Sequence, residues 1–299
     1  MIAGILIGKN PLAVENRMQE INAAISYNTT IKSAFDIALY DILGQHSGMP
    51  LYALLGGEKQ VITTDFTIGI GEPDEVASRA LEYIQEGASS IKVKLGTTTA
   101  EDVARISAIR DAIGMDLPIQ LDANQGWDTV TAIATLKALE PFNITFCEEP
   151  VAHWNNSGLK RVHENSPIPI MADESIFDHR DAFRLAQMQA CSYFNIKLAK
   201  SGGIHNGLKI SAVGEAAGIP CMVGGMFETR VGISAAAHLF ASRRNIIFAD
   251  LDSVHHYRDD PVLGGVEFQG SKVHLPDDPG LGARFDPAFL DTMESITIQ

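Results

Sequence analysis

Three acidic residues that follow three consecutive apolar, β-rich segments give the strongest chemical signal in the chain. They are Asp122 in "PIQLDAN", Glu148 in "ITFCEEP" and Asp173 in "PIMADES". Neighbouring strands lie about 5 Å apart, so the three carboxylates should converge on one volume, where they cannot all ionise without a strong cation. An all-oxygen set with no nearby His or Cys suits Mg²⁺, so we expect a magnesium site. Pairing of the acids with Lys or Arg is the alternative.

Two lysines in other β-rich segments could do acid–base chemistry beside such a metal. Lys94 lies in "SIKVKLG" and Lys197 in "YFNIKLAK", on opposite sides of the expected metal. Lysine loses its proton more readily when it is desolvated or near other cations. Lys92 shares a strand face with Lys94, so Lys94 could act as a base near neutral pH. The alternative is that the lysines only neutralise the acids.

A further pair of acids ends the last β-rich segment, "NIIFADLDS". Asp250 and Asp252 are two residues apart, so their side chains point the same way along a strand. Two like charges on one face require a cationic partner, which is either a ligand or a salt bridge to Arg230, Arg258 or a lysine.

Other polar residues near these positions are given supporting roles. Glu228 in "GGMFETR" either lines the pocket and contacts substrate or lies in a solvated loop. His255 and His256 lack further His or Cys neighbours, so they are expected to be ordinary loop residues. Residues adjacent to the expected ligands and lysines are expected to support them from outside the metal: Asn124, Glu149, Glu174 and Asn195.

The elements that must position these residues repeat along the chain. From Val93 onward, the centres of the β-rich segments are 25 to 28 residues apart, and the segments between them have helical patterning, as in 73–87, 99–114 and 127–140. Eight strands alternating with helices predict a TIM-type (β/α) barrel, whose active site lies at the C-terminal ends of the strands. A doubly wound open sheet is the alternative, but no G-x-G-x-x-G follows the first strand. The eight segments are 63–70, 90–96, 118–124, 144–150, 169–175, 193–200, 220–225 and 245–253.

The barrel is flanked by two segments outside this period. Residues 1–58 are expected to form a partial, helical capping domain that includes an amphipathic helix over 29–48. Residues 59–256 form the catalytic barrel, and 257–299, rich in Gly, Pro and Asp, form an irregular tail packed over the barrel or the N-terminal helices.

Composition narrows the class of protein. The 299 residues carry a net charge of −14 and no basic cluster, which argues against nucleic-acid or anionic-membrane partners. No apolar run approaches the length of about 18 residues that spans a membrane, and no signal peptide is evident, so a cytoplasmic protein is expected. Assembly into a homo-oligomer is compatible with the sequence. Cys147, Cys191 and Cys221 are widely spaced in apolar runs and are expected to be buried free thiols.

Several motifs in fixed order resemble one known family. "KVK", "DAN", "EEP", "ADES" and "NIKLAKSGG" follow one another at barrel spacing, and "SAFDIALYDILGQHSGMPLYALLGG" resembles the last helices of a capping domain. From about residue 29 to 253 the chain resembles the muconate-lactonizing-enzyme subgroup of the enolase superfamily. The resemblance implies Mg²⁺ bound by Asp122, Glu148 and Asp173, and acid/base catalysis by Lys94 and Lys197 on opposite faces of a substrate α-carbon. It also implies that Lys92 neutralises the substrate carboxylate and that Asn124 supports the metal site.

The acids of the last strand narrow the expected substrate. Within the subgroup, an Asp-x-Asp at the end of the eighth strand resembles that of dipeptide epimerases, where the carboxylates bind the free α-ammonium group. The resemblance therefore implies that Asp250 and Asp252 bind this group and that the chain is an isomerase. The implied reaction is Mg²⁺-dependent epimerisation, by 1,1-proton transfer, at the α-carbon of the C-terminal residue of a small dipeptide such as L-Ala-L-Glu.

Other functions stay open at this point. Related enzymes of the subgroup are N-acyl amino acid racemases, o-succinylbenzoate synthases and muconate-type cycloisomerases; a Schiff-base lyase using Lys94 or Lys197 is a different chemistry. The family's N-terminal antiparallel sheet and mobile loop have no counterpart in this sequence, which begins near the capping helices, so we expect either a fragment or a naturally short protein. We therefore expect weaker water exclusion and substrate discrimination. A truncated, inactive barrel that binds metal or a partner is the third alternative.

Overall fold

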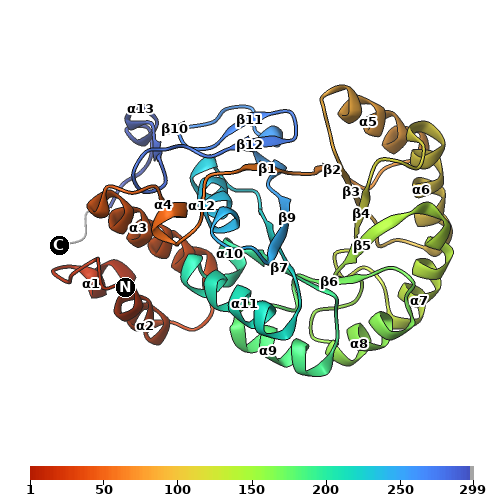
Figure 1. Ribbon diagram of the computed structural model, residues 1–299, viewed down its shortest axis with the longest axis horizontal. Coiled ribbons are helices and arrows are strands. Elements are labelled where there is room, and N and C mark those ends of the chain that lie inside the picture. The colour runs from red at the N-terminus through yellow and green to blue at the C-terminus, as the bar shows by residue number, and fades with distance from the viewer. Residues whose placement is uncertain (297–299) are drawn as a thin grey trace.

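The centre of the protein is an eight-stranded parallel sheet rolled into a barrel. The computed structural model describes residues 1–296. The strands follow one another in sequence order from β2 to β9, and neighbours pair in parallel. The predicted barrel is confirmed (Figure 1). Its strands are β2 (Phe66–Ile68), β3 (Ile91–Lys94), β4 (Ile119–Asp122), β5 (Ile144–Glu148), β6 (Ile170–Ala172), β7 (Tyr193–Lys197), β8 (Cys221–Gly224) and β9 (Ile246–Asp250).

Helices cover the outside of the barrel between successive strands, as the repeat predicts (Figure 1). The helix predicted over 99–114 begins after a capping box, in which Thr98 and Glu101 each bond the other's amide. Asp128 caps the helix predicted over 127–140 by accepting from the amides of Val130 and Thr131. The helices are α5 (Pro73–Gln85), α6 (Thr99–Ile113), α7 (Thr129–Ala138), η1 (Glu140–Phe142), α8 (Asn156–Asn165), α9 (His179–Met188), α10 (Leu198–Ser201), α11 (Ile204–Ala217), α12 (Arg230–Ala241) and η2 (Asp252–His256).

The first predicted strand, over 63–70, is divided in the structure. Its beginning belongs to β1 (Val61–Thr63), which pairs with a strand of the C-terminal tail, and its end is β2. Between them the amide of Asp65 donates to the carbonyl of Ala249 at 3.4 Å and so joins the first strand of the barrel to the last. The barrel therefore closes at Asp65.

The N-terminal residues form four helices beside the barrel: α1 (Ile2–Leu6), α2 (Val14–Ala24), α3 (Thr29–Ser47) and α4 (Leu51–Leu54). Helix α3 matches the amphipathic helix predicted over 29–48 and ends at Gly48, whose φ of 69° suits glycine. Its Asp36 reaches the barrel, where it accepts from the amide of His205 at 3.3 Å and makes a very short contact with the amide of Ile204. A carboxylate of the N-terminal unit thus caps a barrel helix.

The C-terminal tail is more regular than the sequence predicts. It contains β10 (Val262–Gly264), β11 (Glu267–Gln269), β12 (Lys272–His274), β13 (Ala283–Phe285) and α13 (Pro287–Leu290). Strand β12 pairs with β1, and Gly280 exchanges hydrogen bonds with Leu51 and Met49 at 2.8 and 2.9 Å. The tail therefore packs on both the barrel and the N-terminal helices, but the division into three domains stays a prediction.

Apolar side chains fill the barrel and the layer between it and the helices. Phe146, Met171 and Met222 form one buried group inside, with no exposed surface. All three cysteines are free and buried, as predicted. Across residues 1–296, no helix combines the length and the apolar character needed to cross a bilayer.

Candidate active site

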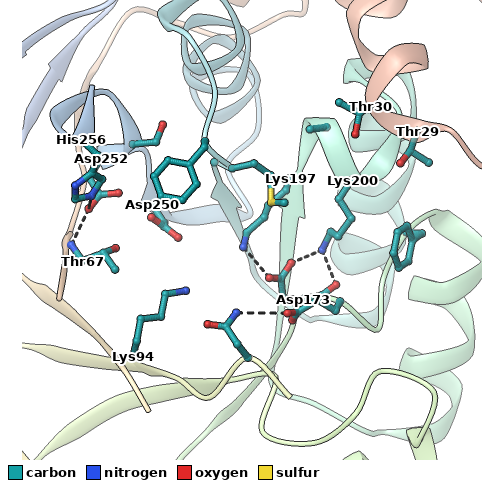
Figure 2. Close-up of a pocket in the computed structure, with 18 residues that line it drawn as sticks. Thr29, Thr30, Thr67, Lys94, Asp173, Lys197, Lys200, Asp250, Asp252 and His256 are labelled. Atoms are coloured by element: carbon teal, nitrogen blue, oxygen red, sulfur yellow. Dashed lines mark hydrogen bonds and ion pairs between the residues drawn. The ribbon is translucent and has the colours of Figure 1, made fainter. Parts of the chain in front are cut away.

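A cavity of about 450 Å³ opens at the C-terminal ends of the barrel strands. Figure 2 shows Lys94 and Lys197 on opposite sides of it, with Asp250 and Asp252 on a third side. The N-terminal unit contributes Thr29 to the wall, together with its neighbour Thr30. The other lining residues include Thr67, Asn124, Asp173, Glu174, Phe177, Lys200, Met226, Phe227 and His256.

The three predicted acidic ligands lie together beneath this cavity, each nearly or fully buried. Asp122 and Glu148 are directly opposite each other in the β4–β5 register, which places their carboxylates on neighbouring strands. Lys92 bridges them: its Nζ lies 2.6 Å from Glu148 Oε2 and 3.1 Å from Asp122 Oδ2. Lys197 bridges the other side, with Nζ 3.7 Å from Glu148 and 2.7 Å from Asp173.

The two predicted catalytic lysines differ in exposure. Lys94 Nζ lies 2.6 Å from Asp122 Oδ2, and its side chain is 27% exposed, whereas that of Lys197 is 7% exposed. Lys200, which the sequence interpretation did not single out, also contacts Asp173 and donates to the carbonyl of Asn195 at 3.1 Å. It follows Lys197 by three residues, and this helical spacing on the short helix α10 is the signal that could have identified it.

The charges of this cluster perturb one another strongly. Burial would raise the pKa of Asp173, but Lys197 and Lys200 hold it well below the usual range. For Glu148, burial and the neighbouring carboxylate of Asp122 raise the pKa to about 8. Burial would lower the pKa of Lys197, yet Asp173 and Glu148 outweigh it and raise the pKa above the usual value. Lys197 therefore carries a proton in this arrangement.

Neighbouring polar residues fix the orientation of the acids. Asn195 donates to Glu148 Oε1 at 2.6 Å, and the amide of Asn124 donates to Asp122 Oδ1 at 2.9 Å. Glu149 does not face the cluster; it accepts from the amides of Asp173 and Ser175 at 2.7 and 3.1 Å. Burial raises the pKa of Glu149 to about 7. These contacts place all three residues where they can position the strand-end acids.

Of the remaining predicted residues, some line the cavity and one does not. Glu174 lines the cavity and accepts from Asn124 Nδ2 at 3.4 Å. Glu228 does not line it: its carboxylate turns back to accept from the amide of Met226 at 3.0 Å. His256, expected to be an ordinary loop residue, does line the cavity, and its Nε2 lies 3.8 Å from Asp252.

Asp250 and Asp252 are buried and face the cavity. Asp252 Oδ2 accepts from the amide of Thr67 at 2.6 Å, and Asp250 Oδ2 lies 2.7 Å from Lys92 Nζ. Of the salt-bridge partners considered from the sequence, a lysine is therefore present, whereas Arg230 pairs with Asp260 instead.

Two groups of acids in the described residues have the chemistry to hold a cation. Asp122, Glu148 and Asp173 offer an all-oxygen set in which Glu148 Oε2 is buried and has no aligned hydrogen-bond donor, although Lys92 is close. Such an oxygen fits a hard divalent ion such as Mg²⁺. The second group is Asp65, Asp250 and Asp252, which have carboxylate oxygens within 4.8 Å of one another. The sequence analysis did not predict Asp65 as a site residue, because its only signal is a charge within a β-rich segment.

Comparison with known proteins agrees with this geometry. Residues 75–289 match the family model described as enolase C-terminal domain-like. Residues 1–56 match the N-terminal domain of the mandelate racemase / muconate lactonizing enzyme family. The chain is 44% identical to the D-Ala-D/L-Ala epimerase of Cytophaga hutchinsonii, over 98% of this chain and 80% of that protein.

Two further relatives and one solved structure extend the comparison. The L-Ala-D/L-Glu epimerase of Bacillus subtilis is 40% identical, over 93% of this chain and 76% of that protein. The N-succinyl-L-Arg/Lys racemase of Bacillus cereus is 32% identical, over 98% and 79%. A crystal structure of the dipeptide epimerase from C. hutchinsonii, complexed with Mg and the dipeptide D-Ala-L-Val, superposes with a TM-score of 0.95 and 44% identity, covering 97% of this chain and 79% of that one. The chain belongs to the mandelate racemase / muconate lactonizing enzyme family.

Proposed function

We propose that the protein is an isomerase that epimerises small dipeptides at the α-carbon of the C-terminal residue, with Mg²⁺ as cofactor. The observation that carries the proposal is the pair Lys94 and Lys197 on opposite sides of a cavity that also presents Asp250 and Asp252. Relatives that act on dipeptides, at 40% and 44% identity, support this substrate class over the N-succinyl amino acids of the relative at 32%.

In the proposed reaction, Lys94 and Lys197 exchange protons with the substrate from opposite faces. One lysine removes the α-proton and the other delivers a proton to the opposite face, which inverts the configuration. For the isomer whose α-proton faces Lys94, Lys94 is the base and Lys197 the acid, and the two roles are exchanged for the other isomer. Asp250 and Asp252 would bind the α-ammonium group, and Lys92 would lie near the substrate carboxylate.

Asp122, Glu148 and Asp173 would hold Mg²⁺, supported by Asn124, Glu149, Glu174 and Asn195. A bound Mg²⁺ would supply positive charge where negative charge accumulates as the α-proton leaves. Glu228, which does not line the cavity, receives no substrate contact in this proposal.

Isotope exchange tests the proposal directly. We expect the full chain, with Mg²⁺ in D₂O, to incorporate deuterium at the C-terminal α-carbon of Ala–Ala, Ala–Val or Ala–Glu and to produce both configurations there. A metal chelator should stop the exchange. Absence of α-deuteration across this panel of free-amino dipeptides would contradict the proposal.

The racemisation of N-acyl amino acids is the rival within the family, since one relative has this activity in its name. Such substrates lack an ammonium group, so Asp252→Asn distinguishes the two: a dipeptide should lose binding, whereas an N-acyl substrate should keep it. A cytoplasmic location, a homo-oligomer and the division into three domains stay predictions.

A further inference from the structure

Asp65 is a buried carboxylate with no bonding role in the fold. Its side chain is 1% exposed, and neither oxygen has a hydrogen-bond partner. A buried polar group without a partner costs about 1–3 kcal/mol, and a charged one costs more. The buried side chain of Asp65 therefore lowers the free energy of unfolding of the protein.

The backbone, not the carboxylate, holds this segment in place. The amide of Asp65 bonds to Ala249, and the amide of Phe66 donates to the carbonyl of Ser90 at 3.3 Å. The preceding Thr64 accepts from the amide of Leu251 through its hydroxyl at 2.8 Å. These bonds join the segment to β9 and β3 and do not depend on the type of side chain at position 65.

The carboxylate of Asp65 is directed at the other two acids of its cluster. Its oxygens come within 4.8 Å of those of Asp250 and Asp252. The nearby cation, Lys92, lies within 3.1 Å of Glu148, Asp250 and Asp122 and donates a hydrogen bond to Asp250, but it makes none to Asp65. Burial, followed by Asp250 and Asp252, raises the pKa of Asp65 well above its usual range. Lys92 is paired with Asp250, and His256 lies 3.8 Å from Asp252, whereas no described cation is hydrogen-bonded to Asp65.

We propose that Asp65 is a positioning residue for the α-ammonium group of the dipeptide and acts on it through Asp250 and Asp252. Asp65 does not line the cavity, whereas the other two acids do. An arriving ammonium group offsets the burial and the repulsion that favour the protonated form of Asp65. Asp65 then ionises beneath the other two acids and adds negative potential that stabilises the bound cation. This inference rests on the proposed function.

Asp65→Asn separates charge from shape, since the two side chains have the same size. The affinity for Ala–Ala relative to N-acetyl-Ala–Ala, measured by calorimetry on the full chain, should fall about tenfold, as expected for removing one charge near the bound ammonium. In turnover, the loss should fall on KM rather than kcat. The melting temperature should rise, because a buried, unpaired acid is removed. Asp65→Ser is the second variant if the asparagine form does not fold.

Two controls separate this role from general damage. Asp102→Asn also removes a fully buried acid, one that bonds Arg105 and the indole of Trp127, so it should lower the melting temperature and keep the preference for the free amine. Mg²⁺ binding, titrated by calorimetry without dipeptide, should be unchanged in Asp65→Asn. A loss of Mg²⁺ affinity there would assign Asp65 to a metal site and overturn the inference.

The outcomes also separate this inference from the proposed function. If the wild-type protein prefers the free amine and Asp65→Asn retains that preference in full, the role of Asp65 is wrong while the ammonium site stands. If the wild-type protein shows no preference for the free amine, both are wrong. A drop in melting temperature with equal losses for both ligands would make Asp65 a structural residue.

Discussion

At the scale of single residues, the site is a set of lysines shared among carboxylates. Asp173 contacts two lysines, Lys197 and Lys200, and Lys92 contacts three acids. Only Lys94, held by Asp122, keeps more than a quarter of its side chain exposed. Each lysine is therefore held in a fixed place around the cavity, which is the condition for proton transfer from a defined face.

The two faces can be tested separately. In Lys94→Ala, deuterium incorporation from one configuration of the dipeptide should fall by a factor of about 10² to 10⁴, since its proton acceptor is lost. Incorporation from the other configuration should persist, and Lys197→Ala should give the reverse pattern. Proton and mass spectra of each starting isomer in D₂O measure both. Equal loss from both isomers in each variant would contradict a two-base arrangement.

The sequence predicts these strand-end residues because a side-chain period of two and parallel neighbours determine where they point. Lys94, Asp122 and Glu148 are adjacent in register, as the convergence argument requires. Asp65, His256 and Thr29 were missed because their positions depend on contacts between distant segments. The amide of Thr67, for example, binds Asp252, 185 residues away.

At the scale of elements, helix α11 depends on a residue from α3. Asp36 caps its first turn, and a Cβ at Gly203, where φ is 112°, would come within 2.2 Å of the Asp36 carboxylate. Glycine is therefore required there. Burial raises the pKa of Asp36 to about 8, although the amides of Ile204 and His205 oppose the shift.

This shift predicts a pH dependence of stability. The ordinary pKa of an aspartate carboxyl is 3.8, so between about pH 4 and 8 the unfolded chain releases a proton that the folded chain keeps. The stability that the raised pKa of Asp36 gives the folded protein is fully present below pH 4 and is lost as the pH rises through 8. Between pH 5 and 8.5 the unfolding free energy of the wild type should fall by more than about 1 kcal/mol relative to that of Asp36→Asn. Urea titrations at the two pH values measure this difference.

Asp36→Ala provides the contrast for this prediction, because it also removes the acceptor at the helix end. It should lower the stability at both pH values by about 1–2 kcal/mol. Identical pH profiles for the wild type and Asp36→Asn would show that Asp36 is ionised throughout this range.

The elements themselves could be predicted to different degrees. Strands and helices of the barrel follow the sequence because each has its own apolar period. The strands of the tail and β1 have only three residues each, too few to show a period, and β1 pairs with β12 across about 210 residues of sequence. For this reason the tail was expected to be irregular.

At the scale of the whole molecule, His238 of α12 joins the barrel to both flanking segments. Its Nδ1 accepts from the amide of Tyr52 at 3.1 Å, and its Nε2 donates to the carbonyl of Leu281 at 3.2 Å. The bond to Nδ1 requires a neutral ring, because a protonated Nδ1 cannot accept. Burial lowers the pKa of His238 to about 4, from the ordinary histidine value of 6.5.

Acid should therefore weaken this junction. Between about pH 6.5 and 4 the unfolded chain binds a proton that the folded chain does not, so stability falls as the pH falls. The glutamine in His238→Gln can keep one hydrogen-bond acceptor and one donor, but it does not titrate. The variant should therefore lose about 1–3 kcal/mol less unfolding free energy than the wild type as the pH falls. Urea midpoints at pH 4.5 and 7.5 measure this. An unchanged loss in the variant would assign the acid sensitivity to other groups.

The closure of the barrel has a consequence for engineering the protein. The amide of Thr64 donates to Ser271 of the tail at 2.9 Å, next to the acid that we place beneath the substrate site. No described residue beyond His256 lines the cavity, yet the tail sets the course of the chain into β2. Tags, fusions or truncations at the C-terminus can therefore change substrate affinity without touching the substrate, so such variants need a binding assay as well as a measure of expression.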